Sequence, residues 1–263
     1  MLFRSFSSPT NGNYHPGYSL SLKLLGGFEV RKGKHVVGAE EWKRERARQM
    51  LQALALNREK GVSKEQLSLY FWPNADESTA NNNFKVTLSA LNQALEPNRP
   101  SKESPLFVIR NADQYQLNPL APIRIDLEEF EQLALSPNLT DRREALELYE
   151  GRLLEGEFLQ EFFMPEMQYF HRLYLDSLGK TIEVCIQEED YEKGLELSNR
   201  LVRQEPLLEA GYQFQMRIYH AMGITAMLRK VYQQALDVYR SEYGADSEPD
   251  ELKKVYQKLM AHS

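Results

Sequence analysis

Amide, hydroxyl and ammonium side chains are frequent between residues 82 and 93. Asn and Gln side chains can form paired hydrogen bonds with the edge of adenine, Lys favours guanine or phosphate, and a Val methyl can contact the thymine methyl. These residue types would suit a surface that reads base edges in double-stranded DNA. The candidates for this role are Asn82, Asn83, Lys85, Val86, Ser89 and Gln93.

Two further groups of polar residues could hold the DNA backbone. Cations at the start of a predicted helix could grip phosphates and fix the register without reading sequence. Polar residues of a predicted hairpin could reach a minor groove or the backbone. Each residue taken singly is more simply a solvated surface side chain, whereas together, in their order along the chain, they favour DNA. The helix group is Lys43, Arg44, Arg46 and Arg48, and the hairpin group is Arg110, Asn111 and Gln114.

The elements that must position these residues follow from hydrophobic periodicity and turn signals. Alternation bounded by glycine turns predicts a small antiparallel meander, helical spacing then predicts three helices, and two alternating segments around an Asn/Asp turn predict a β-hairpin. The meander covers residues 19–25, 28–31 and 35–37, the helices 42–57, 63–72 and 74–95, and the hairpin 106–110 and 114–117. This order predicts a winged helix-turn-helix domain over residues 19–120.

The third of these helices, Asn74–Leu95, is predicted to be the recognition helix. A weak capping box, Asn74 to Glu77, introduces it, and Pro97 ends it. One face is expected to pack on the two preceding helices, and Asn92 is placed on the opposite, solvent-facing side with the base-reading candidates. The face expected to be buried consists of Ala80, Phe84, Leu88, Leu91 and Leu95.

From Ile125 onward the chain is predicted to be helical. The predicted segments are 126–135, 142–149, 166–185, 191–202, 207–222 and 224–239. Two of the turns between them lie 34 residues apart, the period of tetratricopeptide helix pairs; an irregular helical bundle is the alternative. In the 166–185 helix, Tyr169, Phe170, Leu173, Leu175 and Leu178 are available for burial. The fold class is therefore mostly α (α+β), with residues 1–18 as a flexible arm or linker remnant and 121–263 as a tetratricopeptide-like domain.

The charge is divided unevenly between the halves of the chain. Residues 1–120 carry a net charge of +5 and residues 121–263 a net charge of −11, which sum to the overall −6. Such asymmetry is a recognised sign of one domain that faces a polyanion and one that faces something else. Chance segregation of surface charge is the alternative.

Composition and motifs favour a cytoplasmic protein that is not an enzyme. No apolar run is long enough to span a membrane, the N-terminus lacks the apolar core of a secretory signal, and the single Cys185 excludes an intramolecular disulfide. None of the common phosphate-binding, nucleophile or metalloprotease motifs is present, and the five histidines are scattered. We therefore expect no catalytic residue, no metal ligand and no cofactor.

Several segments resemble a known bacterial family. The first half of the chain is similar to the DNA-binding domain of regulators of the antibiotic-regulatory-protein (SARP) type, which resembles the response-regulator winged helix. The similar segments are Leu24–Val30, Arg46–Leu51, Val62–Leu67 with Phe71–Pro73, Ala80–Leu91 and Tyr115–Leu117. The second half resembles that family's bacterial transcriptional activation domain, which is built of tetratricopeptide-like helices. The segments that carry this resemblance are Asp126–Phe130, Ala145–Gly151, Glu205–Pro206 and Gly244–Pro249. The resemblance covers about residues 20–260.

This resemblance implies a transcription factor whose helical half contacts RNA polymerase or a regulatory protein domain. It also leaves open that the chain is the effector part of a larger regulator of the MalT or response-regulator type. The chain departs from the family where members often carry arginines, because Lys85 is the single cation between Asn74 and Leu95. Binding as a monomer is then expected to be weak, so that tandem sites or a homodimer would be needed. A pure interaction scaffold with a degenerate winged helix is the alternative function.

Overall fold

The computed structural model describes residues 14–157 and 163–261. These residues divide into two compact units. Unit 1 contains the chain up to Leu127 together with the segment Leu153–Glu166, and unit 2 contains Glu128–Arg152 and everything after Glu166. The chain therefore leaves unit 1 within one helix and returns to it for a short segment before it continues into unit 2.

Unit 1 opens with the predicted meander, which is extended by a strand that the sequence did not reveal. Strands β1 (Leu20–Lys23), β2 (Glu29–Lys32) and β3 (His35–Val36) pair antiparallel, and β7 (Ile123–Ile125) pairs parallel with β1, so that the strand order is β3-β2-β1-β7. The meander is confirmed. The strand β7 was missed because three residues show too little alternation, and its partner lies about a hundred residues earlier in the sequence.

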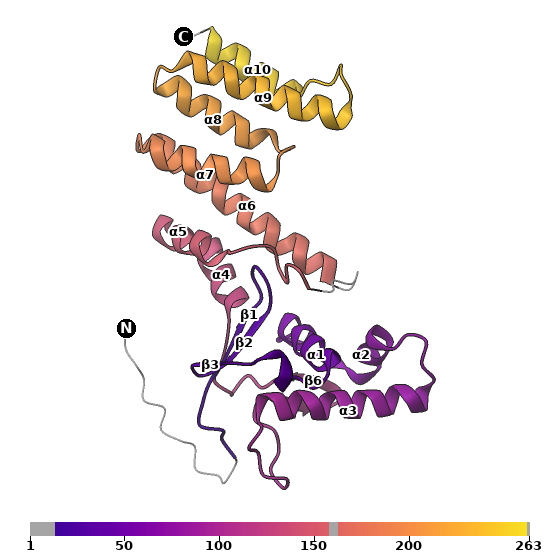
Figure 1. Ribbon diagram of the computed structural model, residues 1–263. Helices are drawn as coiled ribbons and strands as arrows, with labels where there is room; N and C mark the ends of the chain where they lie inside the picture. The colour runs from indigo at the N-terminus through magenta and orange to yellow at the C-terminus, as the bar shows by residue number, and fades with distance from the viewer. Residues whose placement is uncertain (1–13, 158–162, 262–263) are drawn as a thin grey trace. The chain divides into compact units, whose positions relative to one another are not determined.

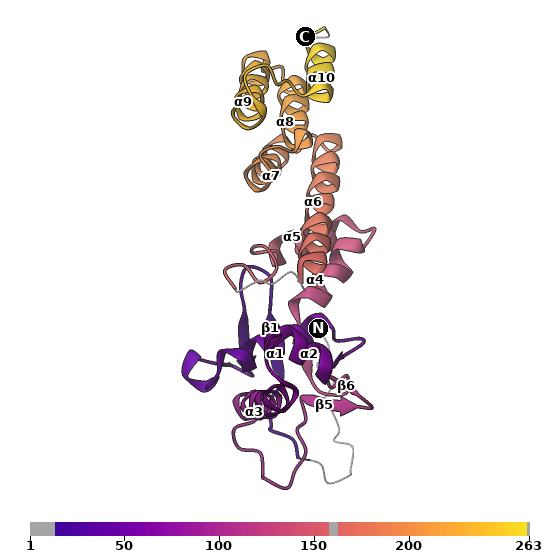
Figure 2. The same ribbon diagram turned by 90° about the vertical axis from the view of Figure 1, so that its right-hand side faces the viewer.

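Three helices follow the meander in unit 1. They are α1 (Glu45–Leu56), α2 (Lys64–Phe71) and α3 (Glu77–Leu95), after a short 3₁₀ turn at Ala39–Glu41. Helices α1 and α2 lie on the same side of α3 (Figures 1 and 2). Their apolar faces form the core with the hairpin strands, and the buried side chains include Met50, Leu51, Leu54, Phe71, Phe84, Leu91, Val108 and Leu117.

The starts of two of these helices differ from the prediction. Helix α1 begins at Glu45 instead of Trp42, because Lys43 has a positive φ of 55° and Arg44 is extended. Helix α3 begins at Glu77, and its cap is Asp76 instead of Asn74. The Asp76 carboxylate accepts hydrogen bonds from the amide and the hydroxyl of Thr79, at 2.9 and 2.7 Å. The box between Ser63 and Gln66 at the start of α2 is confirmed.

Helix α3 is buried more widely than a single stripe. Of the predicted stripe, Leu88 is half-buried and the others are buried, as expected. The placement of Asn92 on the solvent side is wrong, because its exposed fraction is only 8%. The last turn of α3 has neighbours from distant parts of the sequence, because Lys32 and Tyr18 donate hydrogen bonds to the carbonyl oxygens of Ala94 and Leu95.

The hairpin of unit 1 is part of a three-stranded sheet. Strands β5 (Val108–Asn111) and β6 (Gln114–Leu117) pair antiparallel, and β4 (Val62–Ser63) adds to the other edge of β6. The residue before β4 is Gly61, with φ of +69°, and a Cβ there would lie 3.0 Å from the Tyr115 carbonyl oxygen. A glycine is therefore needed for the chain to approach β6 this closely.

Unit 2 is a succession of helices. They are α4 (Asp126–Leu135), α5 (Leu139–Leu148), α6 (Met164–Gln187), α7 (Tyr191–Gln204), α8 (Glu209–Ala221), α9 (Thr225–Tyr243) and α10 (Asp250–Met260). Helix α8 packs on α7, α9 and α10, and these helices are stacked side by side in Figure 1. Their shared core is formed by Val202, Tyr212, Met216, Leu228, Val231, Ala235 and Leu252. The predicted mostly helical fold with a small N-terminal sheet is confirmed.

One side chain of α6 departs from its predicted environment. Tyr169 was expected to be available for burial, but it is 42% exposed and its hydroxyl donates to the Glu131 carboxylate. Its neighbours Phe170, Leu173 and Leu178 are buried, whereas Leu175 is half-buried. The helical period explains this, because Tyr169 lies beside the buried stripe and its polar hydroxyl extends to the edge of the unit.

Candidate nucleic-acid interface

Helix α3 presents a row of polar side chains along one face. Asn82, Lys85, Ser89 and Gln93 are exposed and follow each other at three- and four-residue steps, so they share one side of the helix. Val86 and Asn83 flank this row and are half-buried. The structure therefore brings four of the six base-reading candidates together, with the other two at the margin of the row.

One member of this row, Ser78, was not among the residues predicted from the sequence. Ser78 is exposed and precedes Asn82 by four residues in the first turn of α3. The signal was present in the helical period, because a four-residue step places Ser78 on the same face as Asn82. Ser78 extends the exposed face to the N-terminal end of the helix.

The N-terminal end of α3 carries a negative charge. Hydrogen bonds from the Thr79 hydroxyl and amide hold the pKa of the Asp76 carboxyl below its usual range. This ionised carboxylate already bonds an amide that would otherwise attract a phosphate. The helix terminus is therefore a poor site for an anion, and the side chains of the exposed row remain the candidate contacts of α3.

The four basic residues at the start of α1 lie in two different environments. Lys43 and Arg44 are exposed. The Arg46 guanidinium donates to the Gln49 side chain at 2.7 Å and lies 5.6 Å from the centre of the Phe71 ring. Lys43 and Arg44 are the members of this group best placed to meet a phosphate.

Arg48 is occupied within unit 1. Both of its terminal nitrogens contact the Glu157 carboxylate, one of them also bonds Glu45, and its guanidinium lies 5.2 Å from the centre of the Phe28 ring. Burial alone would lower the pKa of Arg48, but the bonds to Glu157 raise it. Arg48 is therefore firmly cationic and already neutralised by a neighbour.

The tip of the β5–β6 hairpin exposes the predicted hairpin residues. Arg110 and Asn111 are exposed, and Gln114 is half-buried. The Arg110 side chain donates to the Ala112 carbonyl at 3.0 Å and pairs with Asp113 at 3.3 Å, both on the exposed turn. Such a surface pair is weak, so a phosphate could replace Asp113 at small cost.

An aromatic contact ties the hairpin to α3. The ring of Tyr115 on β6 meets the ring of Phe84 on α3 edge to face, with the ring centres 4.9 Å apart. The hairpin lies beside α3 in Figure 2. Two candidate DNA-contacting elements, α3 and the hairpin, therefore form one packed assembly within unit 1.

Neither a metal-binding cluster nor a helix able to span a membrane is found in the part of the chain that the structure describes. Within residues 14–157 and 163–261, no cluster of His, Cys, Asp or Glu side chains could hold a metal ion. No helix in the same part of the chain is long and apolar enough to cross a membrane.

Comparisons with known proteins agree with this architecture. Among solved structures, the chain resembles Mycobacterium tuberculosis EmbR in complex with low affinity phosphopeptide, with a TM-score of 0.72 and 16% sequence identity. The match covers 94% of this chain and 66% of that one, so this chain spans just under two thirds of the length of its structural relative. No curated protein matches the sequence.

The family comparison concerns the second half of the chain. The model of the bacterial transcriptional activator domain matches residues 125–260. Together with the fold, this match confirms the resemblance to SARP-type transcriptional regulators that the sequence motifs indicate. Because the matched segment makes up more than half of the chain, the protein belongs to the bacterial transcriptional activator domain family, a family of transcriptional regulators and not a class of enzymes.

Proposed function

We propose that unit 1 binds double-stranded DNA in a sequence-specific way and that the chain acts as a transcriptional activator. The observation that carries this proposal is the exposed row of α3, which stands opposite the buried face of the same helix; that buried face contacts the hairpin through Phe84 and Tyr115. A helix with this division of faces can enter a major groove while its apolar side stays packed on the domain. Family membership supports the regulatory role.

Reading and holding of DNA are divided between different elements in this proposal. Asn82, Val86 and Ser89 offer an amide, a methyl face and a hydroxyl to base edges, and Lys85 offers a cation to guanine or phosphate. Lys43 and Arg44 hold phosphates, and Arg110 with Asn111 contacts the minor groove or the backbone from the hairpin tip. Because α3 carries a single cation, it releases few counterions, and its contribution to the salt dependence is small.

Unit 2 contributes the regulatory contact. Its stacked helices and the net charge of −11 over residues 121–263 support a role in binding RNA polymerase or a regulatory protein domain. Weak binding of DNA by the monomer favours a homodimer on tandem sites, since two linked half-sites raise the overall affinity.

The single cysteine, Cys185, is buried, which suits a bacterial cytoplasm.

The test of the DNA-binding proposal is the affinity for random duplex DNA at two salt concentrations. We expect the binding constant to fall as the salt concentration rises. The double variant Lys43→Ala/Arg44→Ala should bind more weakly and should reduce the slope of this dependence by about one for each lost phosphate contact.

The matched control removes two exposed cations of unit 2, Arg229→Ala/Lys230→Ala, and should leave both the affinity and the slope unchanged. Binding that is undetectable at low salt with a folded sample, or that is independent of salt, would favour the interaction scaffold instead. If the wild type does bind DNA, selection of bound duplexes from a random pool identifies its cognate site.

A further inference from the structure

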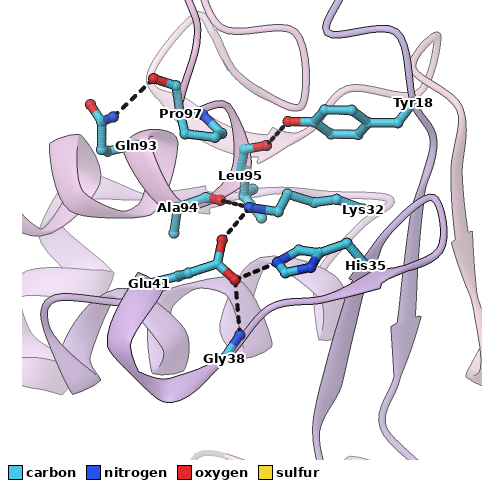
Figure 3. Close-up of polar contacts among 9 residues, drawn as sticks. All are labelled: Tyr18, Lys32, His35, Gly38, Glu41, Gln93, Ala94, Leu95 and Pro97. Atoms are coloured by element: carbon cyan, nitrogen blue, oxygen red, sulfur yellow. Dashed lines mark hydrogen bonds and ion pairs between the residues drawn. The ribbon is translucent and has the colours of Figure 1, made fainter.

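The C-terminal end of α3 is held by side chains that come from the start of the chain. The last carbonyl groups of a helix have no partner within the helix and require one from elsewhere. The Lys32 ammonium donates to the Ala94 carbonyl oxygen at 3.1 Å, and the Tyr18 hydroxyl donates to the Leu95 carbonyl oxygen at 2.5 Å (Figure 3). These are the last two residues of α3.

Lys32 also supplies the charge that this end of the helix lacks. The last turn of α3 contains no basic residue of its own. The carbonyl end of a helix is negative and is stabilised by a nearby cation. Since the Lys32 side chain is only 7% exposed, little water screens this interaction.

The position of Lys32 is itself fixed by a second set of bonds. The Glu41 carboxylate contacts the Lys32 ammonium at 2.5 Å and His35 at 2.7 Å, and it accepts from the Gly38 amide at 3.0 Å (Figure 3). Burying a charged lysine is costly unless it is paired and hydrogen-bonded. Glu41 provides that pairing, so the ammonium is directed at the end of α3 and not at the solvent.

The same end of α3 is connected to the hairpin. Glu96, which follows α3, accepts hydrogen bonds from the amides of Leu106 and Phe107 at 2.9 and 3.0 Å, and its side chain is fully buried. The Tyr18 ring stacks on the Phe107 ring with the ring centres 6.0 Å apart. Tyr18 therefore touches both α3 and the segment that leads into β5.

The length of α3 turns a small motion at this end into a large one at the reading face. Asn82 lies 12 residues from Ala94, about 18 Å along the helix axis. A tilt of about 10° at the held end would displace Asn82 by about 3 Å, which is more than a hydrogen bond tolerates.

We propose that Lys32 and Tyr18 are positioning residues for DNA reading: they bond the end of α3 so that Asn82 and Lys85 keep the direction required to meet base edges, and Tyr18 holds the hairpin at a constant place beside the helix. This inference rests on the proposed DNA-binding function. Neither residue contacts DNA in it. Both act through α3.

The test compares each positioning residue with a matched neighbour. Tyr18→Phe removes only a hydroxyl. Tyr14→Phe removes one from the same segment, and within the described part of the chain this hydroxyl makes no hydrogen bond to α3. Lys32→Met removes a positive charge from the end of β2, and its control Lys34→Met removes one from the turn between β2 and β3, where Lys34 is exposed. The dissociation constant is measured for the selected cognate site and for a random duplex, together with the salt dependence and the thermal unfolding of each variant.

We expect Tyr18→Phe and Lys32→Met each to lose about tenfold in affinity for the cognate site, about 1.4 kcal/mol. Tyr18→Phe should bind random DNA as tightly as the wild type does. Lys32→Met should bind random DNA as tightly as its control Lys34→Met, which lacks the same charge. Tyr14→Phe should bind both DNAs normally, and Lys34→Met should lose equally on both. A purely structural role would lower the unfolding temperature but leave the ratio between cognate and random affinity unchanged, and would overturn the inference.

Three other outcomes are also decisive. If Lys32→Met does not fold, Tyr18→Phe alone decides, because an isosteric loss of one hydroxyl leaves the core intact. If the wild type binds no DNA, the proposed function and this inference fail together. If the wild type binds and the four variants keep its specificity ratio, the inference fails while the proposed function stands.

Discussion

Arg48 and Glu157 form an ion pair in which both terminal nitrogens of the guanidinium contact the carboxylate. The two residues are 109 positions apart in the sequence, and Glu157 belongs to the segment that returns to unit 1 after α5. Both side chains are largely buried, at 20% and 13% exposed. This pair attaches the returning segment to α1. It also engages Arg48, which the sequence predicted to contact DNA phosphates.

Arg48→Ala is therefore expected to act on stability more than on DNA binding. The change leaves the largely buried Glu157 carboxylate without its main partner, and we expect the free energy of unfolding to fall by about 2 kcal/mol. Urea unfolding measures this loss. The control Arg44→Ala, at an exposed position, should change stability by less than about 0.5 kcal/mol while it weakens DNA binding. A stable Arg48→Ala variant with weakened DNA binding would return Arg48 to the interface.

The exposed row of α3 yields a prediction about specificity. Asn82→Ala and Lys85→Ala should each lose about 1–3 kcal/mol on the cognate site and much less on random DNA, since contacts with base edges discriminate between sequences. Fluorescence anisotropy with the two duplexes measures both affinities. Asn98→Ala is the control, because Asn98 is exposed and lies beyond the end of α3. Equal losses on both DNAs would make Asn82 and Lys85 backbone contacts.

The pairing of Glu41 with Lys32 predicts an acid-sensitive stability. Burial would raise the pKa of Glu41, but the hydrogen bonds from Lys32 and His35 outweigh it and lower the pKa from 4.5 to about 2. A carboxyl whose pKa is lower in the folded state stabilises the fold above its unfolded pKa, and this stabilisation is lost as the pH falls toward the folded value. The contribution should therefore be complete at neutral pH and should disappear between about pH 5 and pH 2.

The variant Glu41→Gln isolates this contribution. At pH 7 we expect it to be less stable than the wild type by about 1–3 kcal/mol, as for hydrogen bonds to charged groups, and the difference should shrink as the pH falls below 4.5. Urea unfolding at several pH values gives the difference. Glu40→Gln, at the exposed neighbouring position, should show no such trend. A constant difference across this range would mean that the Glu41 carboxylate is not held by Lys32.

Two helical glycines of unit 2 should respond to alanine in opposite directions. A Cβ at Gly211 would lie 2.7 Å from Cγ2 of Val202, where α8 packs on α7. Gly211→Ala should therefore destabilise the unit by about 1–3 kcal/mol through overpacking. A Cβ at Gly179 would lie 3.8 Å from the Phe214 ring, an ordinary contact, so that Gly179→Ala should stabilise α6 by up to about 1 kcal/mol through helix propensity. Thermal unfolding measures both, and a stabilising Gly211→Ala would contradict the close packing of α7 on α8.

The elements that depend on neighbouring residues could be predicted from the sequence. The capping box at Ser63, the buried stripe from Ala80 to Leu95 and the turn between the hairpin strands all involve residues within a few positions of each other. The alternation and helical period of these segments reflect one buried and one exposed face, which local sequence records directly. The exposed positions of Asn82, Lys85, Ser89 and Gln93 follow from the same period.

Only the tertiary structure decided which polar residues are free and which are engaged. Lys32 bonds a carbonyl 62 positions away, Tyr18 one that is 77 away, and Arg48 a carboxylate 109 away. Asn92 is buried although its place on the helical wheel suggested solvent. Residue type and spacing set what a side chain can bond to, whereas its actual partner depends on which distant segments the packed core brings beside it, and no local pattern contains that information.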